Sequence, residues 1–74
     1  MATVLHLYKG GDPGLAVATI ERQLAAGDRV SVALLHGATL PVLGGAVRIR
    51  RVPDELTYDG LLGEIFASDQ VVTW

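Results

Sequence analysis

The stretch from Ala25 to Gly37, AAGDRVSVALLHG, constrains the fold of this chain more than any other. It contains a helix end, a glycine and a charged turn, and then a nearly continuous apolar run over residues 29–35 that leads into a second glycine. A strand that is apolar along its whole length is typical of a parallel sheet covered on both faces. The stretch therefore predicts the turning point of a βαβ unit, whose ligands and partners usually contact the carboxyl ends of the strands.

The residues before this stretch predict one strand and one helix. Thr3–Tyr8 is apolar with β-branched and aromatic residues, which favours a strand. Asp12 can cap a helix and Pro13 suits its first turn, while Gly27 suits its end. Apolar residues follow at helical spacing and define the face that packs on the sheet: Ala16, Val17, Ile20 and Leu24.

The residues after this stretch give a weaker pattern. Residues 36–45 predict a connection, in which Thr39 to Pro41 could form one helical turn. Ala46–Val52 alternates arginine with aliphatic residues, so one face of this third strand is polar and the strand is expected at a sheet edge. The direction of this strand stays open, because a ten-residue connection is short for a parallel crossover.

The last third of the sequence predicts a second helix and a final strand. Thr57 can cap the helix, and Gly60 and Gly63 weaken it by up to about 1 kcal/mol each unless something packs closely there. Gln70 to Trp74 predicts a short strand. The helix carries five large apolar side chains: Tyr58, Leu61, Leu62, Ile65 and Phe66.

Right-handed crossovers indicate how these elements assemble. If the first two strands are neighbours and the last strand returns to the far side of the first, the two helices cover opposite faces. The expected fold is a small three-layer α/β/α domain over residues 1–74, with a mostly parallel sheet of about four strands. Since one helix covers about two strands, part of each face is left bare, and we expect an oligomer.

Composition supports the same expectation. Half of the residues are apolar and 19% are charged, against about 25% charged in an average domain. A chain this short has a small core, so the surplus apolar surface is expected at a subunit interface. A net charge of −2 provides no general attraction to nucleic acid or anionic lipid. Residues 30–47 are uncharged, but proline and glycines interrupt them, so we expect no membrane span and a cytoplasmic location.

Three short motifs resemble a known family. The opening Val4-Leu5-His6 resembles the "LH" start of the sulfur-relay subunits called TusB and DsrH. Gly27-Asp28, the apolar strand and His36-Gly37 resemble their "GD…LLLQDG" segment. Leu56-Thr57-Tyr58, followed by a helix and then Trp74, resembles their "DY…W" ending. The chain thus resembles the DsrE/DsrF/DsrH-like sulfur-relay family, and within it the TusB/DsrH-type subunit.

The resemblance implies a small α/β/α subunit of homo- or hetero-oligomers that pass persulfide sulfur between cysteines, for tRNA 2-thiolation or sulfur oxidation. TusB-type subunits commonly lack the transferring cysteine. This chain has no cysteine, and sulfur transfer requires a thiolate. We therefore expect a non-catalytic, assembly-forming subunit with cysteine-bearing DsrE/F-like partners. Two features differ from the family: His36 replaces an acidic residue, and the segment before Tyr58 is shorter.

Five residues are candidates for contact with a ligand or partner: Lys9, His36, Arg48, Arg50 and Trp74. Lys9 opens a glycine-rich loop, and His36 follows the second strand, where an imidazole can bind a partner or transfer a proton. The two arginines could contact an acidic partner or RNA, or form a solvated edge that prevents unwanted strand pairing. A tryptophan at position 74 is expected to pack into the core or a subunit contact.

Other kinds of chemistry have weaker support. His6, His36 and Asp12 lack the spacing of metal ligands, so we expect no metal site, and His6 in mid-strand is expected to be a hydrogen-bonded core or interface residue. Ser31 and Ser68 have no histidine near them in sequence, which gives no support for a hydrolase triad. No cofactor is expected.

Two alternatives to a non-catalytic subunit stay open. One is a homo-oligomeric protein that binds a small molecule or anion through the loops around Lys9 and His36, although the loop from Lys9 to Gly14 matches no phosphate-binding motif. The other is an enzyme that uses His36 as a general base. The sequence identifies no substrate for either.

Overall fold

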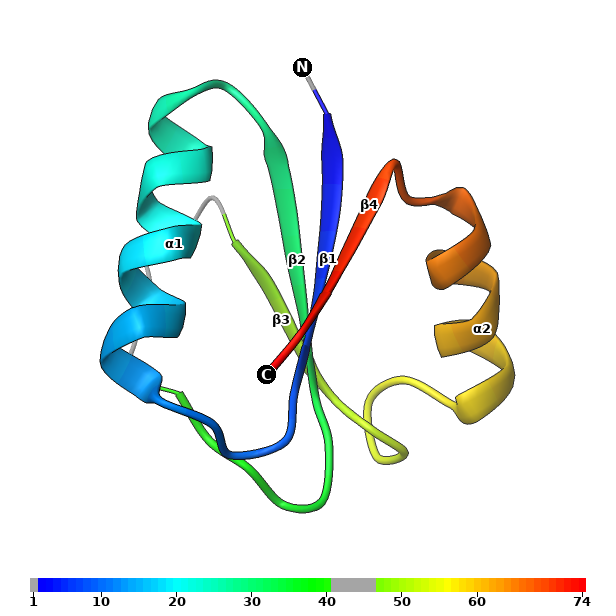
Figure 1. Ribbon diagram of the computed structural model, residues 1–74. Coiled ribbons are helices and arrows are strands. Elements are labelled where there is room, and N and C mark those ends of the chain that lie inside the picture. Colours follow the sequence, from blue (N-terminus) through cyan, green and yellow to red (C-terminus); the bar gives the residue numbers. More distant parts are fainter. Residues whose placement is uncertain (1, 41–46) are drawn as a thin grey trace.

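The computed structural model describes residues 2–40 and 47–74 of the chain (Figure 1). Its elements are β1 (Thr3–Tyr8), α1 (Pro13–Ala25), β2 (Arg29–Leu34), β3 (Arg48–Arg51), α2 (Tyr58–Ala67) and β4 (Gln70–Thr73). The strands form one parallel sheet in the order β3-β2-β1-β4. The helices lie on opposite faces of this sheet (Figure 1). The expected small α/β/α fold, with the first strand between the second and the last, is confirmed.

Both helices begin where the sequence predicts, because each has a side-chain cap. The Asp12 carboxylate accepts a hydrogen bond from the Leu15 N–H at 3.2 Å, and Pro13 occupies the first turn. The Thr57 hydroxyl accepts from the Gly60 N–H at 3.0 Å. Each cap satisfies an amide that the first turn would leave without a partner. Gly27, with φ of 87°, reverses the chain after α1.

Register decides which side chains face each helix. Val4 pairs with Val30 and Leu5 pairs with Ser31, so residues alternate between the two faces along the strands. The α1 face contains the larger buried cluster: Tyr8, Ala16, Ile20, Val30, Val32 and Leu34. The α2 face contains a smaller one: Leu5, Ala33, Val52 and Leu61. Ala16 and Ile20 are fully buried, as their helical spacing predicts.

The third strand is the least accurately predicted element. It is confirmed as an edge strand and it runs parallel to β2, and it spans Arg48–Arg51, so Val47 and Val52 of the predicted range Ala46–Val52 lie outside it. Val52 continues the backbone pairing by donating to the Leu34 carbonyl at 2.9 Å and then turns its side chain into the α2-face cluster. Residues 39 and 40 form no helical turn, and Pro41 to Ala46 lie outside the described residues.

The structure also bears on the membrane and on the second helix. Among the described residues, no helix has the length and apolar character that a membrane crossing requires. A Cβ atom at Gly60 would lie 2.9 Å from the Leu56 Cδ1 atom, whereas a Cβ at Gly63 would meet nothing within 4 Å. Close packing therefore accounts for the first of the two helical glycines and not for the second.

Candidate functional site

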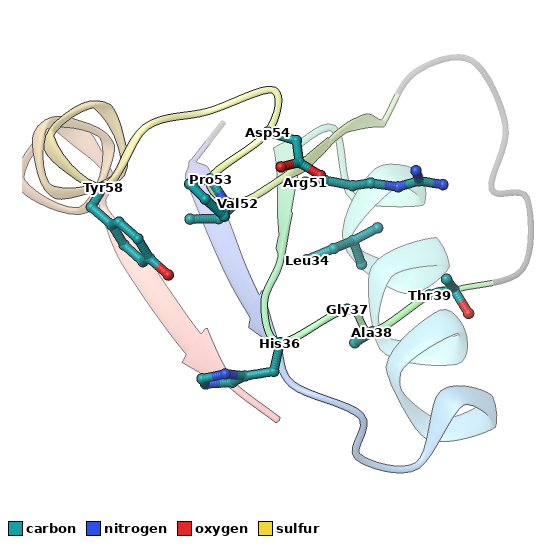
Figure 2. A pocket seen from close by; sticks show the side chains of 10 residues that line it. All are labelled: Leu34, His36, Gly37, Ala38, Thr39, Arg51, Val52, Pro53, Asp54 and Tyr58. Atoms are coloured by element: carbon teal, nitrogen blue, oxygen red, sulfur yellow. The ribbon is translucent and has the colours of Figure 1, made fainter.

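A cavity of about 460 Å³ lies at the carboxyl ends of β2 and β3 (Figure 2). Its lining comes from the end of β2, the turn that follows it, the turn after β3 and the first residue of α2: Leu34, His36, Gly37, Ala38, Thr39, Arg51, Val52, Pro53, Asp54 and Tyr58. Ligands of parallel sheets usually bind at the carboxyl ends of the strands. The volume is in the range of small-molecule sites.

An unusual backbone turn forms one wall of this cavity. His36 has φ of 54° and Gly37 has φ of 72°, so both residues are in the left-handed region. That region is uncommon for residues other than glycine. The turn directs the chain away from the sheet directly after β2, and it brings the His36 imidazole to the cavity. His36 is therefore the one predicted site residue that lines it.

The polar groups of the cavity do not converge on one point. The His36 ring and the Tyr58 hydroxyl lie on one side of the view in Figure 2, and the Arg51 guanidinium extends toward the other. Asp54 adds a carboxylate to the lining. The cavity thus combines a guanidinium, a carboxylate, an imidazole and a phenol with the apolar side chains of Leu34, Val52 and Pro53, so its lining includes both charges that a zwitterionic small molecule carries.

Lys9 is exposed and is not part of that lining. The loop that follows it instead packs against Trp74, since a Cβ atom at Gly11 would lie 3.2 Å from the Trp74 carbonyl carbon. The Trp74 N–H donates to the Leu7 carbonyl at 2.9 Å, which fixes Trp74 beside β1. Trp74 therefore packs against the loop after β1, at the point between β1 and β4 where the strand order reverses.

Trp74 also completes a partly buried hydrogen-bonded network around the buried His6. The Trp74 Nε1–H group donates to the His6 Nδ1 atom at 2.9 Å. An indole nitrogen can only donate, so Nδ1 is the acceptor and the His6 proton is on Nε2. That Nε2–H donates to the Gln23 Oε1 atom at 2.7 Å. The expectation of a hydrogen-bonded core histidine is confirmed, and Trp74 packs on the α1-face cluster.

This network makes His6 a structural rather than a reactive group. His6 is 0% exposed, and burial lowers its pKa from the ordinary 6.5, although the hydrogen bond to Gln23 acts in the opposite direction. The neutral imidazole is therefore the form that the fold accommodates. Both ring nitrogens are occupied, so His6 has no lone pair or proton available for a substrate.

The arginines of β3 have separate roles. Arg50 forms an ion pair with Glu64 of α2, and its side chain is 19% exposed, so the expectation of a wholly solvated edge is wrong for this residue. Arg48 is exposed and lines a second cavity, of about 590 Å³, beside the amino-terminal part of β2. Of the three arginines, Arg51 contributes to the carboxyl-end cavity, and it was not among the predicted site residues.

The other notable feature is an exposed apolar surface on α2 and β4. Tyr58, Leu62 and Phe66 are 64%, 53% and 79% exposed, and Val71 is 38% exposed. The three helical residues are four positions apart and form one stripe. Val71 pairs with Leu5, whose side chain belongs to the α2 face, so Val71 lies on the same side of the sheet as the stripe. We refer to these four residues as the α2–β4 apolar surface.

The described residues hold no cluster of three or more groups suited to a metal ion. Comparisons with models of known protein families, with curated proteins and with solved structures each found no match. The likeness to the sulfur-relay subunits thus remains a prediction from short motifs. The α2–β4 apolar surface was missed as a site, although the sequence does place Tyr58, Leu62 and Phe66 at intervals of four.

Proposed function

We propose that this chain is a non-catalytic subunit that forms an assembly with other protein through the α2–β4 apolar surface. The observation that carries the proposal is the exposure of Phe66, 79%, next to the half-exposed Tyr58 and Leu62. A contiguous apolar patch on a small protein is a common mark of a protein interface. Aromatic residues at such positions contribute most of the binding energy in many complexes.

Charge narrows the kind of partner. The helix α2 carries Asp59 and Glu64 and has no lysine or arginine. An acidic, apolar helix does not suit anionic lipid or nucleic acid, both of which attract basic surfaces. A protein surface with a complementary apolar patch is the occupant that this chemistry favours.

Two observations support the non-catalytic part. The chain has no cysteine, so it has no thiolate for sulfur transfer. One of its two histidines, His6, is fully buried and uses both ring nitrogens in the core network. The other, His36, lines a cavity in which no nucleophile hydrogen-bonds to it among the residues described.

The sequence resemblance extends the proposal to a sulfur-transfer complex. In such a complex this subunit would complete the site of a cysteine-bearing α/β partner and leave the persulfide chemistry to that partner. The purified chain is then expected to gain no sulfur from a persulfide donor, by intact mass. A covalent sulfur adduct on this cysteine-free chain would contradict the proposal that only the partner carries sulfur.

The experiment that tests the assembly role compares two aspartate substitutions. Phe66→Asp places a charge in the α2–β4 apolar surface, and Leu15→Asp places one on the exposed side of α1, where Leu15 is 55% exposed. Self-association, or stoichiometric capture of a partner from native lysate, is expected to be lost with the first variant and retained with the second. If the wild-type chain neither self-associates nor captures a partner in a way that depends on Phe66, the proposal is wrong.

The carboxyl-end cavity supports a second candidate function, the binding of a small molecule. The left-handed His36 is the specific observation that favours it, because strained backbone is often retained where it positions a side chain for a ligand. Native mass spectrometry of the purified protein is expected to show a retained small mass, and His36→Gly is expected to release it. This function would be excluded if the purified protein shows only its own mass and if the NMR signals of the His36 backbone do not move on addition of free amino acids.

A further inference from the structure

The position of the α2–β4 apolar surface on its helix is set by an ion pair on the opposite flank. Glu64 reaches Arg50 on β3, and it follows Leu62 by two residues, which is about 200° around a helix. Leu62 therefore points away from β3, while Tyr58, in the first turn of α2, also lines the carboxyl-end cavity. Since β4 lies at the other edge of the sheet, the stripe is directed toward the β4 side, where Val71 is exposed on the same face.

The stripe is complementary to a second copy of itself. When two copies of α2 pack antiparallel about a two-fold axis at Leu62, Tyr58 of one copy faces Phe66 of the other, twice. Each aromatic ring then meets a ring, which is a favourable contact. The arrangement also opposes the two helix dipoles, and it places the two Asp59 carboxylates about 9 Å apart along the helix axis, near the distance at which salt screens them.

The area of the surface fits a dimer of modest affinity. An aromatic side chain presents about 150–250 Å² when fully exposed, and leucine and valine present less. With the exposed fractions of the four residues, each copy contributes on the order of 450 Å². Two copies thus bury at most about 900 Å² of apolar side chain when all four residues are covered on each, and the polar rim is needed to reach the lower limit of specific interfaces, about 1,000 Å².

We propose that the partner at this surface is a second copy of the chain, which packs α2 against α2 in an antiparallel, two-fold interface centred on Leu62. This inference rests on the proposed assembly function and specifies its occupant and geometry. The alternative dimer is one in which the free edges of two β4 strands pair with each other. Its two-fold axis would lie at β4 instead of at α2.

Sedimentation velocity over about 10 to about 200 μM is the first test, since an interface near the lower size limit is expected to be weak. The wild-type chain is expected to change from monomer to dimer in this range. Phe66→Asp is expected to raise the dissociation constant by at least about 10-fold, and Leu15→Asp to leave it unchanged. Circular dichroism checks that both variants fold, which the exposure of both positions favours.

The cysteine-free sequence permits a second, geometric test. Leu62→Cys places one thiol per chain on the proposed axis, and oxidation is expected to give a disulfide-linked dimer, because residues on the axis face each other. Val72→Cys, on β4, and Leu15→Cys, on α1, are the matched controls and are expected to stay monomeric. Efficient cross-linking through Val72 and not through Leu62 would show edge pairing and would overturn the proposed helix interface.

The outcomes separate this inference from the function on which it rests. The wild-type chain could stay monomeric at about 200 μM and yet capture a different protein in a way that depends on Phe66. That result would show that the partner is not a second copy, and it would still support the assembly function. A dimer that still forms with Phe66→Asp would show that the α2–β4 apolar surface is not the dimer interface. A dimer that is lost with Phe66→Asp and cross-links through Leu62→Cys supports both.

Discussion

The two faces of the sheet are covered to different extents by helices of similar size. On one face α1 buries Ala16 and Ile20 completely. On the other, α2 buries Leu61 and leaves its Tyr58–Leu62–Phe66 stripe in solvent. Both helices carry enough apolar residues to cover a sheet, so the difference is in placement. Apart from the exposed Leu15, the large apolar residues of α1 are on the flank that faces the sheet, whereas those of α2 extend around to a second flank.

This difference indicates which face of the sheet stabilises the fold and which face can contact another protein. The α1 face contains the His6–Gln23–Trp74 network as well as the larger apolar cluster. The α2 face is joined to the sheet by a small cluster and by the Arg50–Glu64 ion pair. Substitutions on the first face are therefore expected to change folding, and those on the exposed stripe of the second to change association.

The largest effect is expected from Ile20→Ala. Removal of this fully buried side chain leaves a cavity under α1 and is expected to lower the free energy of unfolding by about 2–5 kcal/mol. Leu62→Ala, on the exposed stripe, is expected to change it by less than about 0.5 kcal/mol in dilute solution, where the chain is monomeric. Urea denaturation measures both. Equal losses in the free energy of unfolding at the two positions would show that the two helices contribute similarly to stability.

The buried histidine gives the next largest effect and a pH dependence. His6→Leu leaves the partly buried amide of Gln23 and indole N–H of Trp74 without their partner, which is expected to cost roughly 1–3 kcal/mol. Burial lowers the His6 pKa in the folded state, so the unfolded chain binds the proton first as the pH falls. The stability of the wild-type protein is therefore expected to decrease below about pH 6.5.

The pH dependence is measured as a difference. Denaturation of the wild-type and His6→Leu chains at a series of pH values between about 7.5 and 5 cancels the contribution of the carboxylates that both chains share. The gap between their free energies of unfolding is expected to be constant above about pH 6.5 and to narrow below it. A gap that widens as the pH falls would show that the folded state stabilises the charged imidazole.

The sequence was sufficient for the framework of both faces, because local signals determine it. Asp12 and Thr57 mark the helix starts through their own side-chain caps, and the spacing of Ala16, Ile20 and Leu24 marks the buried side of α1. Right-handed crossovers then place the strands. The caps and the helical spacing involve residues within a few positions of each other, and the crossover rule applies to any parallel sheet.

The parts that sequence did not reveal depend on residues far apart in the chain. The bond between His6 and Trp74 joins positions 68 residues apart, and it requires the register of β1 against β4. The Arg50–Glu64 pair depends on which flank of α2 faces β3. The cavity beside His36 depends on a left-handed turn, which the histidine-glycine pair permits but does not specify.

A matched pair of glycine substitutions sharpens the description of α2. Gly63→Ala adds a methyl group that meets nothing within 4 Å and is expected to raise the free energy of unfolding by about 0.5–1 kcal/mol. Gly60→Ala brings a Cβ to 2.9 Å from Leu56 and 3.2 Å from the capping Thr57 hydroxyl, so most of that gain is expected to be lost. Thermal denaturation compares the two. Equal gains would show that α2 packs more loosely against the preceding turn.

The smallest effect is expected at the ion pair that joins α2 to β3. A double-mutant cycle with Arg50→Met and Glu64→Gln is expected to give a coupling energy of about 0.5–1 kcal/mol, since both side chains are partly exposed and the pair is screened by water and salt. Repeating the cycle at about 1 M salt is expected to reduce the coupling. Because this contact turns the apolar stripe away from β3, the double variant is also expected to weaken self-association slightly. A coupling near zero together with unchanged association would show that the apolar cluster around Leu61 alone fixes the rotation of α2.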